Sequence, residues 1–203
     1  FNDMRQDPFI VLDAYVDFVP SEEGTSGYAG KKEVFVDQVY YYFVTDSSTR
    51  LAGIQTGEYD MVEGMPYDSY DQLQSMPDVN THIYYNGTLS VIYNKKEGLM
   101  SDKNMRQAIN TILDDEEIML ASFANEDFYT LNAGFMNFNQ VNWATDAGSE
   151  FYNQADPEKA KEMLEEAGYN GEEVRMIVTR DYNHHYNAAV VVQEQLERAG
   201  VNV

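Results

Sequence analysis

The clearest periodicity in the chain lies within ADPEKAKEMLEEAGYNG, residues 155–171, where apolar side chains recur every three or four positions. Asp156 and Pro157 are typical of a helix start, because aspartate can accept hydrogen bonds from free backbone amides and proline fits the first turn. Gly168 favours the left-handed conformation that ends a helix. The pattern predicts a helix over 157–167. Its buried face is expected to contain Ala160, Met163, Leu164 and Ala167.

Capping residues and apolar spacing predict further helices. Asp46 or Ser47 can begin a short helix that ends at Gly57. Another begins at Ser101 or Asp102 and is expected to break near Asp114 before it resumes. A short helix is also expected within 66–76, and a longer one over 187–199.

Runs of branched and aromatic residues predict strands between these helices. They cover residues 9–18, 34–44, 79–85, 89–96 and 173–179, and a last one begins at 201. Strands that alternate with helices indicate an α/β architecture. Residues 124–154 fit neither pattern and form a long loop rich in aromatic residues and asparagine. Loops of this length are usually functional or disordered, and the aromatic content argues against disorder.

Composition narrows the possible partners. The chain has 203 residues, 43% of them hydrophobic, and a formal net charge of −22. Such acidity argues against a nucleic-acid partner, since phosphates require a basic surface. The chain has no cysteine, which excludes disulfides, thiolate nucleophiles and cysteine metal sites. No apolar run approaches the roughly 20 residues that a membrane-spanning helix needs.

The sequence contains no recognisable catalytic constellation. Phosphate-binding loops, dinucleotide fingerprints and nucleophile elbows are absent. His184 and His185 are adjacent, and neighbours along a chain seldom bind one metal ion, so we expect no metal site. Two alternatives to a binding protein stay open at this point. One is a carboxylate-dependent, glycosidase-like hydrolase, because 35 acidic residues always permit a carboxylate pair. The other is a structural or adhesive domain of the cell surface.

Four stretches, taken in chain order, resemble hallmark segments of one family. They are VDQVYYYFVTDSSTRLAGIQTGEYDMVEG (36–64), YNKKEGLMSDKNMRQAINTILDDEEI (93–118), DPEKAKEMLEEAGY (156–169) and AVVVQEQLERAGVNV (189–203). The family is that of the extracellular solute-binding proteins of family 5, the peptide/nickel type that serves ABC importers. The ordered set spans nearly the whole chain. The resemblance also explains why so well-marked a helix carries no reactive residue, since binding proteins require no chemistry.

The resemblance implies a periplasmic-binding-protein-like (type II) α/β fold with two lobes and a ligand enclosed between them. We expect the chain to be a fragment, with residues 1–88 in the later section of lobe one and 89–203 in the first section of lobe two. The implied function is capture of oligopeptides or dipeptides outside the cytoplasm for ABC permease subunits. The implied protein is a monomer without enzymatic activity or cofactor, and it meets the membrane only through a lipid anchor outside this fragment.

Candidate ligand contacts follow from the same resemblance. The residues carried over by position are Glu63, Gly64, Met65, Tyr84, Leu89, Val91 and His184. Trp143 is added because an aromatic side chain on a long loop suits a stacking wall. We expect His184 to donate a hydrogen bond to the ligand and His185 to point away from it.

Overall fold

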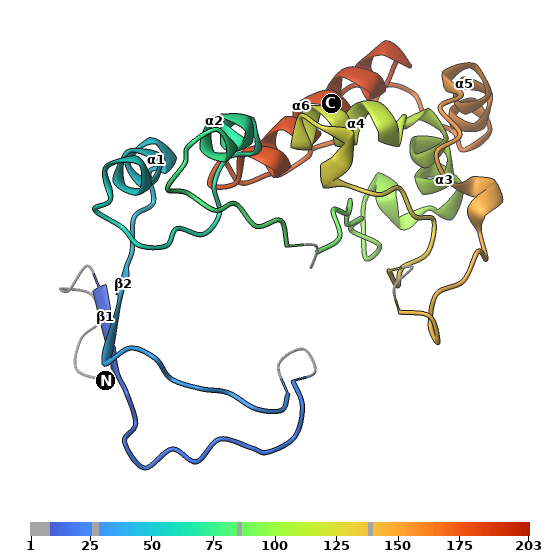
Figure 1. Ribbon diagram of the computed structural model, residues 1–203. Helices are drawn as coiled ribbons and strands as arrows, with labels where there is room; N and C mark the ends of the chain where they lie inside the picture. Colours follow the sequence, from blue (N-terminus) through green and yellow to red (C-terminus); the bar gives the residue numbers. More distant parts are fainter. Residues whose placement is uncertain (1–8, 26–28, 85–86, 138–139) are drawn as a thin grey trace. The chain divides into compact units, whose positions relative to one another are not determined.

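The computed structural model describes residues 9–25, 29–84, 87–137 and 140–203 (Figure 1). The chain forms two compact units, Phe1–Glu63 and Gly64–Val203. The lobe division expected between residues 88 and 89 concerns a larger two-lobed protein, and it stays a prediction.

The first unit contains a two-stranded antiparallel sheet. Strand β1, Phe9–Asp13, pairs with β2, Gln38–Tyr42, so that Phe9 lies opposite Tyr42 and Asp13 opposite Gln38. Both strands fall inside the expected runs but are shorter. The Phe9 ring lies 5.9 Å from Tyr40 and 5.4 Å from Tyr42, which places three aromatic rings together on this ribbon.

Helix α1, Ser47–Thr56, begins and ends where the sequence predicts. The Asp46 carboxylate accepts a hydrogen bond from the Thr49 amide at 2.7 Å, and Gly57 adopts a left-handed φ of 74°. Gly53 is buried beneath the Tyr59 ring, where a Cβ atom would come within 2.3 Å of ring carbons. Only glycine therefore permits this close packing of the segment after α1 against the helix.

The second unit is mainly helical. Its elements are the 3₁₀ turn η1 (Tyr67–Ser69), α2 (Tyr70–Gln74), η2 (Leu99–Ser101), α3 (Lys103–Ile112), α4 (Asp115–Phe123), η3 (Glu126–Phe128), η4 (Ser149–Phe151), α5 (Pro157–Glu166) and α6 (Asn183–Arg198). Asp102, Asp114 and Asp156 accept hydrogen bonds from the first amides of α3, α4 and α5. The expected break near Asp114 is confirmed. None of the helices in the described ranges is long and apolar enough to cross a membrane.

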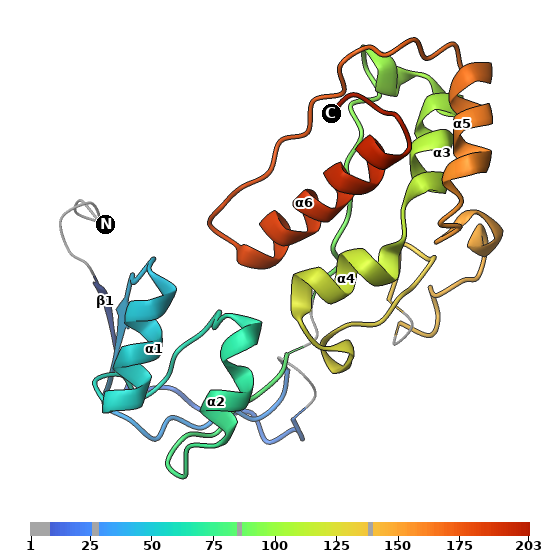
Figure 2. The same cartoon turned by 90° about the horizontal axis from the view of Figure 1, so that it is seen from above.

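The core of this unit lies where α3 packs on α5 and α4 packs on α6 (Figure 2). Ala108 on α3 and Ala160 on α5 are both 0% exposed, so small side chains let these helices approach closely. Around them lie Met105, Ile109, Ile112, Ile118, Leu164, Val192 and Leu196. The predicted buried face of the helix after Asp156 is thereby confirmed at Ala160 and Leu164, while Met163 and Ala167 pack half-buried at its edge.

The expected strands in this unit do not form within the described residues. Residues 79–84, 89–96, 173–179 and 201–203 form neither helix nor strand, and residue 85 lies outside the described part. Side chains in 173–179 still alternate as in a strand, with Val174 and Met176 packed on the core and Ile177 exposed. The Val174 amide donates one hydrogen bond to the Asn202 carbonyl at 2.8 Å. The pattern gives the direction of the side chains, but a strand also needs a continuous partner.

Helix α6 begins at Asn183, four residues before the predicted start. The preceding residue, Tyr182, makes no side-chain hydrogen bond to the free amides of the helix, so the sequence carries no capping signal. Both His184 and His185 therefore lie in the first turn of a helix, whereas the sequence places them in a turn before it.

The end of the long loop is fixed on the junction between α3 and α4. The Asn153 side chain accepts a hydrogen bond from the Asp115 amide at 2.7 Å, and the Asp156 amide donates to the Thr111 carbonyl at 2.9 Å. Asn153 and Ala155 both have a φ of 47°, in the left-handed region that favours glycine. Anchoring contacts thus hold two residues in a conformation that their side chains disfavour.

Candidate functional site

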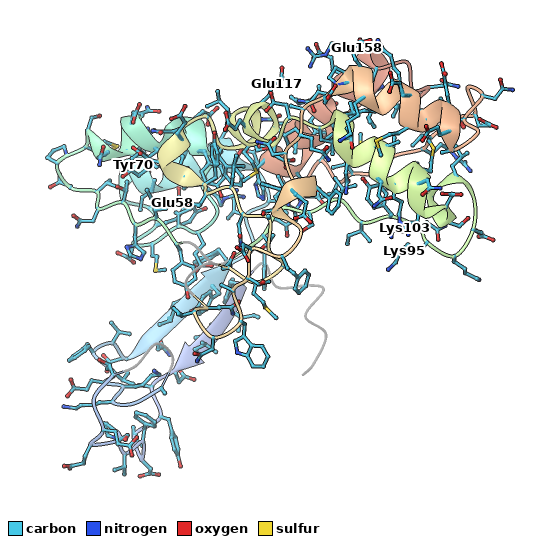
Figure 3. The ribbon with its side chains drawn as sticks, turned by 90° about the vertical axis from the view of Figure 1, so that its right-hand side faces the viewer. Glu58, Tyr70, Lys95, Lys103, Glu117 and Glu158 are labelled. Carbon is cyan, nitrogen blue, oxygen red and sulfur yellow. The ribbon has the colours of Figure 1, made fainter. Side chains whose placement is uncertain are left out.

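Aromatic side chains from four segments of the chain meet around His184. We define the aromatic cluster as Tyr67, Tyr70, Phe123, Phe128, Tyr129, Tyr182, His184 and His185. They come from the η1–α2 segment, the end of α4, η3 with the residue after it, and the start of α6. Tyr70 is labelled on α2 in Figure 3. The cluster joins parts of the chain more than 50 residues apart.

Tyr67 lies at the centre of the cluster. Its ring makes an edge-to-face contact with Phe123 at 4.8 Å and lies 5.6 Å from Phe128 and 5.8 Å from His184. Tyr70 adds an edge-to-face contact with Phe128 at 5.0 Å. Edge-to-face and offset pairs are the favoured geometries of aromatic rings, because the positive edge of one ring meets the negative face of the other.

His184 is half-buried in this cluster. Its imidazole stacks on Phe123 at 5.6 Å and meets His185 edge-to-face at 4.4 Å. Burial lowers the pKa of His184, and the neighbouring His185 lowers it further. The imidazole is therefore neutral at pH 7, with one nitrogen able to donate and the other able to accept a hydrogen bond. Burial also raises the pKa of Tyr67.

Glu63, Gly64 and Met65 lie at the join between the two compact units. Glu63 and Gly64 are exposed, and Met65 is half-buried two residues before the start of η1. Gly64 has a φ of 67°, which turns the chain there. Their contact with a ligand stays a prediction.

The other predicted residues lie on separate segments. Tyr84 is 59% exposed and Val91 48% exposed, while Leu89 packs half-buried against the core. The Trp143 side chain is 72% exposed on the long loop. Of the eight predicted residues, His184 is the one that the described contacts place within the aromatic cluster.

The sequence pattern did not indicate the rings around His184. Tyr67, Phe123 and Phe128 stand at the ends of short helices, where their spacing resembles ordinary core packing. A usable signal would have been their position, since Tyr67 and Phe123 lie at ends of predicted helices and Phe128 lies within the predicted loop 124–154. Helix ends and loops are where binding residues concentrate.

The long loop also surrounds an open hollow of about 450 Å³. The hollow is lined by Leu131, Asn132, Ala133, Ala144, Thr145, Asp146, Ser149 and Tyr152. Trp143 is not among these residues, although it directly precedes one of them. Burial raises the pKa of Asp115, and a hydrogen bond with Tyr152 opposes that rise. Burial and the nearby Asp115 raise the pKa of Tyr152 to about 12, so its phenol remains protonated.

The described ranges contain no group of three or more histidine, aspartate or glutamate side chains that could hold a metal ion. The groups that remain for recognition are aromatic faces, neutral hydrogen-bonding side chains and exposed carboxylates. These groups suit an organic ligand with polar and apolar parts.

Comparison with known proteins agrees with this chemistry. The family described as bacterial extracellular solute-binding proteins, family 5 Middle, matches residues 4–203. A probable peptide ABC transporter periplasmic-binding protein of Sinorhizobium fredii is 30% identical over 196 residues, covering 91% of this chain and 36% of that protein. The oligopeptide-binding protein AppA of Bacillus subtilis is 27% identical over 223 residues, covering all of this chain and 37% of that protein.

The solved structure of Bacillus subtilis AppA in complex with a nonapeptide is also similar. It has a TM-score of 0.59 at 25% identity, covering 100% of this chain and 40% of that chain. The likeness confirms the expected fold, an α/β periplasmic-binding-protein fold of which this chain is a part. The chain spans little more than a third of the length of the curated relatives described above.

Proposed function

Because the chain belongs to the bacterial extracellular solute-binding proteins of family 5, we propose that it is part of the solute-capturing protein of an ABC importer, with oligopeptides or dipeptides as ligands. The observation that carries the proposal is the family match over residues 4–203. Two of the relatives are named as peptide-binding and oligopeptide-binding proteins, which supports peptides over other solutes.

The proposal includes an arrangement of lobes and partners. Residues 1–88 belong to the first lobe and 89–203 to the second, and the ligand is enclosed when the lobes close about a hinge. The whole protein acts outside the cytoplasm as a monomer, delivers its ligand to ABC permease subunits and uses no cofactor. A lipid anchor outside these residues holds it at the membrane. It binds its ligand without chemical change.

A peptide offers carbonyls, amides, a carboxylate and side chains of many kinds. His184 can donate a hydrogen bond to a carbonyl or the terminal carboxylate, since its ring is only half-buried. The Glu63 carboxylate can pair with an amino group. Apolar walls come from Met65, Tyr84, Leu89, Val91 and Trp143, and Gly64 forms the turn directly before Met65.

The first experiment identifies the ligand. The full-length protein is purified under native conditions, and mass spectrometry is applied to the small molecules released on denaturation. We expect peptides of two or more residues. Free amino acids, a disaccharide or a nickel complex as the main bound species would contradict the peptide assignment.

The second experiment measures affinity and activity with the same probes. Calorimetry compares a dipeptide mixture and a nonapeptide mixture with a matched mixture of free amino acids, and chromatography then checks whether the peptides are recovered intact. We expect peptide binding without cleavage. Turnover that disappears when one carboxylate is replaced would favour the hydrolase alternative.

A further inference from the structure

An exposed turn joins the end of α5 to the segment that follows it. The turn contains Asn170 and Gly171, one of the two Asn–Gly pairs in the sequence, and both residues are exposed. The other pair, Asn86–Gly87, includes a residue outside the described ranges. Gly171 has a φ of 85°, and a Cβ atom there would meet nothing within 4 Å beyond its chain neighbours. The space around this peptide bond is therefore open.

The hydrogen bonds of the turn leave two reactive groups unbonded. The Asn170 backbone amide donates to the Glu172 carboxylate at 2.8 Å, and the Gly171 carbonyl accepts from the Asn202 side chain at 3.2 Å. Among the described residues, neither the side chain of Asn170 nor the backbone N–H of Gly171 makes a hydrogen bond. An amide carbon that can be attacked and the nitrogen that can attack it are thus both available.

We propose that Asn170 is a site of spontaneous deamidation. The Gly171 backbone nitrogen attacks the side-chain carbonyl carbon of Asn170 and closes a five-membered succinimide ring. The C–N bond to the side-chain NH₂ group breaks, and this group leaves as ammonia with the proton from the attacking nitrogen. Water then opens the ring at either carbonyl, which leaves an aspartate or an isoaspartate. Glycine favours the ring closure because it has no side chain to obstruct the attack.

The turn also holds residues 201–203 in place through Asn202. The backbone N–H of Asn202 donates to the Tyr169 hydroxyl at 2.8 Å, and its carbonyl accepts from the Val174 amide at 2.8 Å. Its side chain makes the contact with the Gly171 carbonyl. The adjacent Val201 is 2% exposed and belongs to the core.

Isoaspartate should disturb this connection. Its main chain runs through the side-chain carbon of residue 170, so the path to Gly171 becomes longer. The longer path displaces the Gly171 carbonyl from the Asn202 side chain. Deamidation at Asn170 should therefore loosen residues 201–203 from the turn, although the reaction itself takes place on the surface.

The first test follows the reaction in the full-length protein, kept in mildly acidic or mildly alkaline buffer. Peptide mapping by mass spectrometry records residues 162–175, a tryptic segment in which Asn170 is the single asparagine. Asn142 is the internal comparison, because it is exposed and the bulky Trp143 follows it. We expect conversion at Asn170 to be at least about tenfold faster than at Asn142, because ring closure depends on unobstructed approach. The alkaline sample should react faster, since base removes the proton of the attacking nitrogen.

The matched variant is Asn170→Gln. Glutamine keeps a side-chain amide but has to close a larger ring, so conversion at position 170 should fall by about tenfold or more. Conversion at Asn170 no faster than at Asn142 would overturn the proposal. Equal conversion in the parent and Asn170→Gln proteins would also overturn it.

The second test measures the structural consequence. Anion exchange separates the isoaspartyl protein by its added negative charge, and amide hydrogen exchange is followed at Val174. We expect exchange about two- to tenfold faster than in the parent, the equivalent of about one hydrogen bond. Asn170→Asp carries the same charge on an ordinary main chain and should stay within about twofold of the parent.

Unchanged exchange at Val174 in the isoaspartyl protein would overturn the coupling to residues 201–203. Equal acceleration in Asn170→Asp would also overturn it, because the effect would then come from charge. Neither test uses a ligand, so failure of the proposed function is detected separately by calorimetry.

Discussion

The His184 imidazole lies 5.6 Å from the Phe123 ring, and the two planes are inclined by 25°. This stacked geometry places a titratable ring beside an aromatic face, while His185 contributes a second basic group at 4.4 Å. The environment thus favours the neutral imidazole, which makes the packing around His184 sensitive to pH.

We expect the aromatic cluster to weaken as the pH falls. The pKa of His184 is lowered in the folded chain, first by burial and then by His185, from an ordinary value of 6.5. The unfolded chain therefore binds more protons in this window, so stability rises with pH. The stabilisation is complete above pH 6.5, and it is lost as the pH falls through the lowered folded-state value. Thermal unfolding followed between pH 7.5 and pH 4.5 measures this loss.

His184→Gln supplies the control for the pH experiment. Glutamine keeps much of the volume and cannot titrate, so its variant should lack the part of the pH dependence that comes from position 184. A parent and a His184→Gln protein with the same pH profile would assign the dependence to other groups.

The two histidines should differ in ligand binding. In the full-length protein with a bound peptide mixture, His184→Ala should weaken binding about ten- to hundredfold, because a hydrogen bond to a charged group contributes about 1.5–3 kcal/mol. His185→Ala should change affinity by less than about threefold. Isothermal calorimetry on the two variants provides the comparison. Small and equal effects would mean that His184 serves packing alone.

A buried polar contact between α4 and α6 should matter for stability. The Gln195 side chain is 4% exposed, accepts from the Asp114 amide at 3.0 Å and donates to the Glu117 carboxylate at 2.7 Å. Gln195→Leu removes the partner of the Asp114 amide, while Glu117 keeps its ion pair with Arg198 at 3.0 Å. We expect a loss of about 1–3 kcal/mol in the free energy of unfolding. Urea denaturation measures it.

Gln193, on the same helix, is the matched control because it is exposed. Within the described residues, its side chain donates a hydrogen bond to Glu197 at 2.8 Å. Gln193→Leu should cost less than about 0.5 kcal/mol. Comparable losses in both variants would show that leucine itself is unsuitable on α6.

Enlarging the contact between α3 and α5 should also destabilise the chain. Ala160 is 0% exposed against a helix that presents the equally buried Ala108. Ala160→Leu must displace neighbouring atoms, which typically costs about 1–3 kcal/mol. Glu165→Leu, at an exposed position of the same helix, is the control and should have little effect. Differential scanning calorimetry of both variants measures the difference, and an unchanged melting temperature for Ala160→Leu would contradict this packing.

Local signals predicted local structure well in this chain. Asp156 was expected to cap a helix, as were Asp46 or Ser47 and Ser101 or Asp102, and Asp46, Asp102 and Asp156 do so. Asp114 was expected only to mark a break, and it caps the helix that follows. Capping depends on neighbours within three residues, so it can be predicted from the local sequence. The start of α6 was placed too late because Tyr182 gives no such signal. The strands over 89–96 and 173–179 were wrong for the described chain, since a ladder depends on a partner that local pattern does not specify.

The candidate site was harder to predict because its contacts are not local. His184 was selected through a family resemblance, yet two of the rings that pack against it, those of Tyr67 and Phe123, are far away in sequence. Both rings lack periodic spacing with His184. The exposure of Trp143 follows from the backbone of a long loop, which no repeat in the sequence specifies.

The two left-handed residues at the end of the long loop restrict how this segment can diverge. Asn153 and Ala155 hold φ values of 47°, a region that costs a side-chain-bearing residue about 1–2 kcal/mol. Among orthologues, position 155 should accept glycine or asparagine freely and reject valine and isoleucine, whose branched carbons clash most in that conformation. The substitutions accepted at these positions should therefore be biased towards residues that tolerate a positive φ. In a library of all substitutions at positions 153 and 155, the variants that fold should carry mainly small or hydrogen-bonding side chains.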